Sequence, residues 1–91
     1  MAESARVELR HLRYFCQLAD ELHFGRAATR LAVSQPALSV QIKQLEEMVG
    51  ARLLERHSRH VSLTDAGRVF EEAARRILPA VEAAIHATRQ A

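Results

Sequence analysis

The chain has 91 residues, which is room for one small domain, and 48% of them are hydrophobic, so a core can form. Its single cysteine, Cys16, excludes an internal disulfide and suits a reducing cytoplasm, and no apolar run is long enough for a signal peptide or a membrane-spanning helix. The net charge of +2 is weak evidence for nucleic-acid binding by itself, and the distribution of the charges along the chain says more.

Helical spacing of apolar residues predicts two helices near the N-terminus. The stripe from Leu9 to Leu22 includes Cys16, which we therefore interpret as a core residue and not a reactive thiol. A shorter helix is expected from about Gly25, taken as its N-cap, to Ala32. Its paired alanines, Ala27 and Ala28, would let another helix approach closely.

A third helix is predicted after a tight connection at Ala32 and Val33. Ser34 would cap it, Pro36 would lie in its first turn, and Gly50 would end it. Its buried stripe consists of Leu38, Ile42, Leu45 and Val49. A short helix, a tight turn and a capped helix together make a helix-turn-helix unit.

Two strand-like segments, 53–56 and 61–63, follow with a polar turn between them, so we expect a hairpin. Thr64 would then cap a last helix that reaches Gln90, about 40 Å long at ~1.5 Å per residue. Three short helices cannot cover an apolar stripe of that length, which favours a dimer interface over packing within the domain. Pro79 predicts a kink near residues 75–79, or a helix that stops at Leu78 and restarts.

Cations concentrate in two windows that contain no acid, residues 22–45 and 56–64. After folding they could form one basic face, although ordinary solvated charge explains them equally well. The outward side of the third helix would offer Gln35, Ser39 and Lys43, whose side chains suit base edges and phosphates. The hairpin would be a wing with a basic tip, and arginine in a narrow minor groove reads DNA shape.

The run AATRLAVSQPALSVQIKQLEEMVGARLLERHSRHVSLTDAG resembles the LysR-type transcriptional regulators, and the opening ELRHLRYFCQLADELHF is similar to the first helix of that family. The resemblance implies a mainly α fold, a winged helix-turn-helix of three helices and a two-stranded wing followed by a long linker helix. The expected divisions are an N-terminal tail at 1–8, the DNA-binding domain at 9–63 and the linker helix at 64–91. It also implies that this chain is part of a longer cytoplasmic protein, whose small-molecule inducer binds a C-terminal domain outside these residues.

The same resemblance assigns roles to particular positions. The implied base-reading residues are Gln35, Pro36, Ala37, Ser39 and Val40. Arg59 would enter the minor groove from the wing. The implied DNA-backbone contacts are Arg10, Ser34, Lys43, Arg56 and Ser58. The homodimer would form through Phe70, Ala73, Ile77, Val81, Ala84 and Ile85 of the linker helix. Val40 departs from the family, where Arg or another polar residue is common, and Pro79 departs from a continuous linker helix.

Other classes of function fit the sequence less well. The five histidines have no repeated metal-ligand spacing, so we expect neither a metal site nor a cofactor. No nucleophile, base and orienting group lie at plausible spacing, which argues against an enzyme or an enzyme fragment. The remaining alternative is a winged helix used as a protein–protein interaction module, which the fold alone does not exclude. Double-stranded DNA is the expected partner.

Overall fold

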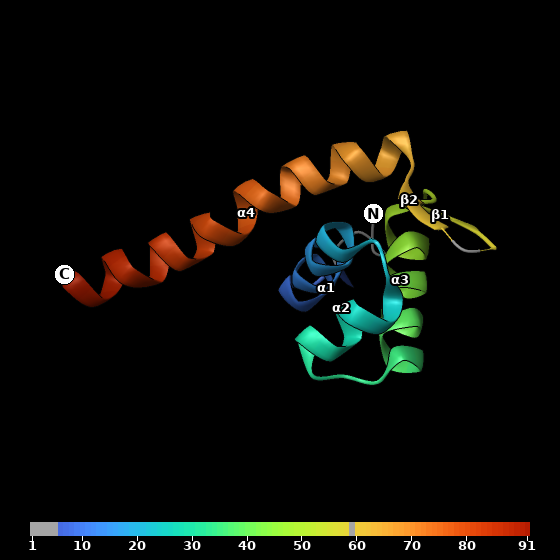
Figure 1. Cartoon of the computed structure of the whole chain (residues 1–91). Helices are drawn as coiled ribbons and strands as arrows, with labels where there is room; N and C mark the ends of the chain where they lie inside the picture. The colour runs from blue at the N-terminus through green and yellow to red at the C-terminus, as the bar shows by residue number, and fades with distance from the viewer. Residues whose placement is uncertain (1–5, 59) are drawn as a thin grey trace.

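A computed structural model describes residues 6–58 and 60–91. Three short helices, α1 (Leu9–Glu21), α2 (Phe24–Leu31) and α3 (Gln35–Val49), precede an antiparallel hairpin of β1 (Leu54–His57) and β2 (His60–Leu63). The long helix α4 (Asp65–Gln90) ends the chain and extends well past the three-helix unit (Figure 1). The predicted fold class, three helices with a two-stranded wing and a long final helix, is confirmed.

The core lies where the three short helices and the start of the wing meet. Its small members, Ala27 and Ala28, let α2 approach α1 and α3 closely, as the sequence predicted. The largest fully buried side chains are Phe15 and Leu18 of α1, Leu38, Ile42 and Leu45 of α3, and Leu53 and Leu54 at the wing. Because α3 buries this one stripe, its opposite side remains in solvent.

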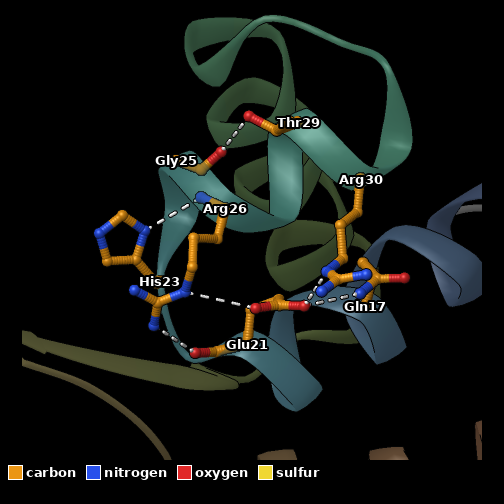
Figure 2. A network of polar contacts seen from close by, with 7 residues as sticks. All are labelled: Gln17, Glu21, His23, Gly25, Arg26, Thr29 and Arg30. Carbon is orange, nitrogen blue, oxygen red and sulfur yellow. Dashed lines mark hydrogen bonds and ion pairs between the residues drawn. The ribbon is translucent and has the colours of Figure 1, made fainter.

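The corner between α1 and α2 is held by polar contacts that the sequence did not predict (Figure 2). Glu21, at the end of α1, pairs with Arg30 at 2.6 Å and with Arg26 at 3.4 Å. The predicted N-cap, Gly25, is wrong: His23 is the N-cap of α2, and its Nδ1 accepts the Arg26 N–H at 3.0 Å. The imidazole can act as a cap because the extended backbone at His23 brings its ring nitrogen to the first turn.

The predicted caps of α3 are confirmed. The Ser34 hydroxyl accepts the Ala37 N–H at 3.1 Å, and Pro36 lies in the first turn, where a missing N–H leaves no gap. Gly50 ends the helix with φ +77, a left-handed conformation in which a side chain is strained.

The wing strands differ by one residue from the predicted 53–56 and 61–63. The ladder pairs Leu54 with Leu63 and His57 with His60, so the strands extend further toward the tip. Leu53 lies before the ladder because its backbone has other partners: its N–H donates to the Glu46 carboxylate at 2.8 Å and its carbonyl accepts the Thr64 N–H at 3.0 Å.

Helix α4 is uninterrupted from Asp65 to Gln90, with Pro79 inside it, and Figure 1 draws one continuous coil. The alternative in which the helix stops at Leu78 and restarts is therefore wrong. Pro79 is exposed, so water can reach the Arg75 carbonyl that has no N–H donor from residue 79. The alternative of a kink near 75–79 stays a prediction.

The first half of α4 packs on α1 and the second half leaves the domain. Ala74 is buried against Leu12 and Cys16, while Phe70 meets Phe15 edge-on with ring centroids 5.5 Å apart. Arg75 adds a polar link, because its guanidinium pairs at 2.6 Å with Asp20 near the end of α1. Beyond Leu78 only Val81 is partly buried in the described chain.

His11 is a buried histidine at the start of α1, only 3% exposed. Its Nδ1 accepts the Glu8 N–H at 2.9 Å in a capping box, and its Nε2 has no hydrogen-bond partner among the described residues. Burial, aided by nearby Arg10 and opposed by Glu8, lowers the pKa of His11 below its ordinary value of 6.5. The folded state therefore resists protonation more than the unfolded chain does.

Because the pKa of His11 is lower in the folded state than in the unfolded chain, we predict that the domain loses stability as the pH falls below about 6.5. In that range the unfolded chain binds a proton at His11 more readily than the folded state does. The slope contributed by one such group is at most about 1.4 kcal/mol per pH unit. His11→Gln, which keeps a capping-box acceptor, should flatten the profile, whereas exposed His86→Gln should not. Urea unfolding between pH 7.5 and 5 measures this, and equal profiles for wild type and His11→Gln would contradict it.

Candidate nucleic-acid interface

The outward side of α3 presents a continuous polar surface with one apolar residue in it. The exposed members are Gln35, Pro36, Ala37, Val40 and Lys43, all of which the sequence placed in the DNA contact. Val40 is 53% exposed, as expected for a position opposite the buried Leu38 and Ile42. A short helix, a tight turn at Ala32 and an exposed second helix are the geometry that presents side chains to the major groove.

The wing lies beside this surface and is tied to it by Arg56. Its guanidinium donates to the Ser39 hydroxyl at 3.3 Å and lies 4.1 Å from the centroid of the Phe24 ring. Ser39 is consequently half-buried at the edge of the α3 face nearest the wing. Ser58 is exposed in the wing turn, and Arg59, the predicted minor-groove residue, lies outside the described residues.

The remaining predicted backbone contacts occupy two different places. Arg10 is exposed on the first turn of α1; it forms an ion pair with Glu8 and donates from Nε to the Gln41 side chain of α3 at 3.3 Å. Ser34 lies at the start of α3, where its hydroxyl is already the helix cap. Ser34 and Lys43 belong to α3 and its cap, and folding brings the distant Arg10 of α1 beside that helix.

Sequence reasoning missed the residues that hold these parts together. The Glu46 carboxylate of α3 accepts hydrogen bonds from the backbone N–H groups of Leu53 and Leu54, at 2.8 and 3.2 Å, which fixes the base of the wing against α3. Phe24 is the platform under Arg56. Glu46 lies in the LEEMVGARLLER part of the run quoted above, but its partners are main-chain groups, which a pattern of side chains does not reveal.

The predicted dimer residues divide between core and solvent. Phe70 is half-buried and packs edge-on against Phe15, so the domain's own core covers part of this side chain. Ala73 and Val81 are half-buried and Ala84 is exposed. Ile77 and Ile85 are 45% and 41% exposed, large for isoleucine. Within this predicted set, the exposed members Ile77, Ala84 and Ile85 form the exposed apolar stripe of α4. Val69, which is 70% exposed, lies outside the set.

Features of other functional classes are weak in the described part of the chain. No cluster of three His, Cys, Asp or Glu side chains there could hold a metal ion. Cys16 is buried, and burial raises the pKa of its thiol, which makes it a poor nucleophile. Across residues 6–58 and 60–91, none of the helices has the length and apolarity needed to cross a membrane.

A helix-turn-helix whose second helix is exposed, followed by a hairpin fastened to it, defines a winged helix-turn-helix domain. The chain belongs to the bacterial regulatory helix-turn-helix proteins of the lysR family, whose sequence profile matches residues 9–68. It is 59% identical over 76 residues to the HTH-type transcriptional regulator YnfL of Escherichia coli, covering 84% of this chain and 26% of that protein. It is 62% identical over 64 residues to AlsR of Bacillus subtilis, covering 70% and 21%.

Solved structures of two DNA-binding domains are similar to this chain over nearly its whole length. The DNA-binding domain of BenM in complex with catB site 1 DNA superposes with a TM-score of 0.88 at 44% identity, covering 92% of this chain and 94% of that one. The CbnR DNA-binding domain in complex with DNA gives a TM-score of 0.90 at 42% identity, covering 92% and 97%. The chain spans only about a quarter of the length of curated relatives such as YnfL and AlsR.

Proposed function

We propose that this chain binds double-stranded DNA sequence-specifically as the DNA-binding part of a bacterial transcription regulator. In this proposal α3 enters the major groove and the wing follows the adjacent minor groove. The observation that carries it is the exposed face of α3, where Gln35, Val40 and Lys43 stand on a helix braced by α2 and fixed to the wing. The relatives named as transcriptional regulators and the DNA-bound neighbours support it.

We also propose how two chains assemble on DNA. Residues 9–63 would be the DNA-reading unit and 64–91 the linker helix, which pairs two chains through its exposed apolar stripe. A two-fold dimer reads a two-fold site, so the operator would be an interrupted palindrome with half-sites one helical turn, or a multiple, apart. A longer protein would add the inducer-binding domain, and the site of action would be the cytoplasm, where bacterial DNA lies.

The test selects bound sequences from a random DNA pool and measures the complex by sedimentation. We expect the selected DNA sequences to be palindromic and each site to bind two chains. The affinity should fall steeply with added salt, because lysines and arginines displace counterions from phosphates. A tight one-to-one complex without dyad preference would contradict the dimer. Absence of salt-dependent DNA binding would favour the protein-interaction alternative.

Arg59 is proposed to enter the minor groove beside the site read by α3. Arg59→Ala should weaken binding about tenfold where the flank is A·T-rich and less where it is G·C-rich, because the narrow A·T minor groove attracts arginine. Arg13→Ala, which removes the same charge from the exposed side of α1, is the control. Equal losses on both flanks, or none, would remove the wing tip from the interface.

Val40 is proposed to read a thymine by contact, since an outward apolar side chain can pack on the C5-methyl group but cannot hydrogen-bond a base edge. Replacing the contacted thymine with uracil should weaken wild-type binding about fourfold, the effect of one methyl group at ~0.8 kcal/mol. Val40→Ala should lose that sensitivity. If every uracil replacement affects wild type and Val40→Ala equally, Val40 only fills space.

A further inference from the structure

Arg56 is held from two sides at the junction of the wing and the helix-turn-helix. Its guanidinium lies 4.1 Å from the centroid of the Phe24 ring, a nearly buried side chain at the start of α2. From that position one Nη donates to the Ser39 hydroxyl at 3.3 Å. A cation over an aromatic face is attracted by the ring, so the guanidinium has a preferred position even before DNA binds.

This contact gives the Ser39 hydroxyl a direction. A guanidinium has donors only, so in this hydrogen bond Ser39 Oγ must be the acceptor. One lone pair of the oxygen is then occupied, and its O–H proton points elsewhere. The adjacent positive charge also makes the O–H a better donor and the remaining lone pair a poorer acceptor. An incoming amino group, which carries partial positive charge, would further be repelled by Arg56.

We propose that Arg56 is a positioning residue that sets Ser39 as a hydrogen-bond donor toward DNA. Ser39 then reads an acceptor on a base edge in the major groove, which is purine N7, guanine O6 or thymine O4, and rejects the amino group of cytosine. Serine alone pairs with donors and acceptors alike, so this contact converts a permissive residue into a selective one. The inference rests on the proposed function, because it requires α3 to lie in the major groove.

The experiment crosses base analogues with protein variants on the selected operator. Each analogue deletes one acceptor: 7-deazapurines remove N7, 2-aminopurine removes guanine O6, and 5-methyl-2-pyrimidinone removes thymine O4. The variants are Ser39→Ala, Arg56→Met and Arg56→Lys, with Arg13→Met as the matched loss of one charge. Methionine keeps an apolar stem over Phe24 without donors, and lysine restores a charged donor. Circular dichroism and thermal melting confirm that each variant is folded.

We expect one analogue position to weaken wild-type binding about three- to tenfold, the range of a single hydrogen bond. Ser39→Ala should show no further loss at that position. Arg56→Met should show less than about a twofold loss there and should tolerate cytosine, while Arg56→Lys regains part of the discrimination and Arg13→Met behaves as wild type. A merely structural Arg56 would lower affinity for all sequences and leave this analogue effect unchanged.

Three results would overturn the inference. First, the base analogue could weaken DNA binding by Arg56→Met as much as it weakens binding by wild type. Second, a Ser39-dependent loss could follow deletion of an amino group instead of an acceptor, which would make Ser39 an acceptor. Third, Ser39→Ala could leave the effect of every analogue on binding unchanged, which is expected if the Ser39 hydroxyl donates to a carbonyl of its own helix. Failure of the proposed function is distinguishable, because wild type would then select no DNA.

Discussion

Replacing Gly67 with alanine is expected to unfold the domain or to destabilise it by about 3 kcal/mol or more, a large part of the stability of a small domain. A Cβ added at Gly67 would lie 2.1 Å from the backbone carbonyl oxygen of Leu53 and 3.0 Å from its carbon. Neither atom belongs to a flexible side chain. The same carbonyl accepts the Thr64 N–H at 3.0 Å, so relieving the clash would separate α4 from the base of the wing.

Gly50→Ala is the control for this prediction. Gly50 has nothing within 4 Å of an added Cβ, but its φ of +77 makes alanine strained by about 1 kcal/mol. Urea unfolding of the two variants compares a backbone clash with backbone strain. We expect Gly67→Ala to be far less stable than Gly50→Ala, and the reverse order would show that α4 can start without touching Leu53.

The second large effect is expected on the linker helix. Ile77→Glu combined with Ile85→Glu should weaken binding to a site with two half-sites at least about 100-fold, while affinity for a single half-site stays within about twofold. Both isoleucines lie on the exposed apolar stripe of α4, and pairing two chains there would bury charged carboxylates. Joining two binding units raises avidity by roughly 10²–10⁴, which is what the variant would lose.

Ala83→Glu serves as the matched control, because residue 83 lies on the opposite side of α4 from Ile77 and Ile85 and is exposed. It adds a carboxylate to the same helix without touching the stripe. Sedimentation of the free protein should show monomers for the double variant and dimers for Ala83→Glu. Equal affinity of wild type and the double variant for the two-half-site DNA would contradict a dimer through α4.

Local sequence patterns predicted the helices, whereas contacts between distant residues were not visible in the sequence. Helical spacing placed α1, α3 and α4 within a residue of their observed bounds, and Ser34 and Gly50 marked the ends of α3 because caps are local interactions. The cap of α2 was missed because histidine is an uncommon capping residue and Gly25 is a common one. The start of β1 shifted because Leu53 bonds to Glu46 and Thr64, partners that no strand pattern contains.

Within the candidate site, the sequence alone determined which residues face outward on α3, since the buried stripe of Leu38, Ile42 and Leu45 leaves only one other side. Only the tertiary structure determined which side chains from other elements contact the functional residues. Arg56, predicted to contact the DNA backbone, also contacts Phe24 and Ser39. Phe70, predicted at the dimer interface, also packs edge-on against Phe15. Periodicity is a property of neighbours along the chain, whereas the orientation of a long side chain depends on atoms that folding brings from elsewhere.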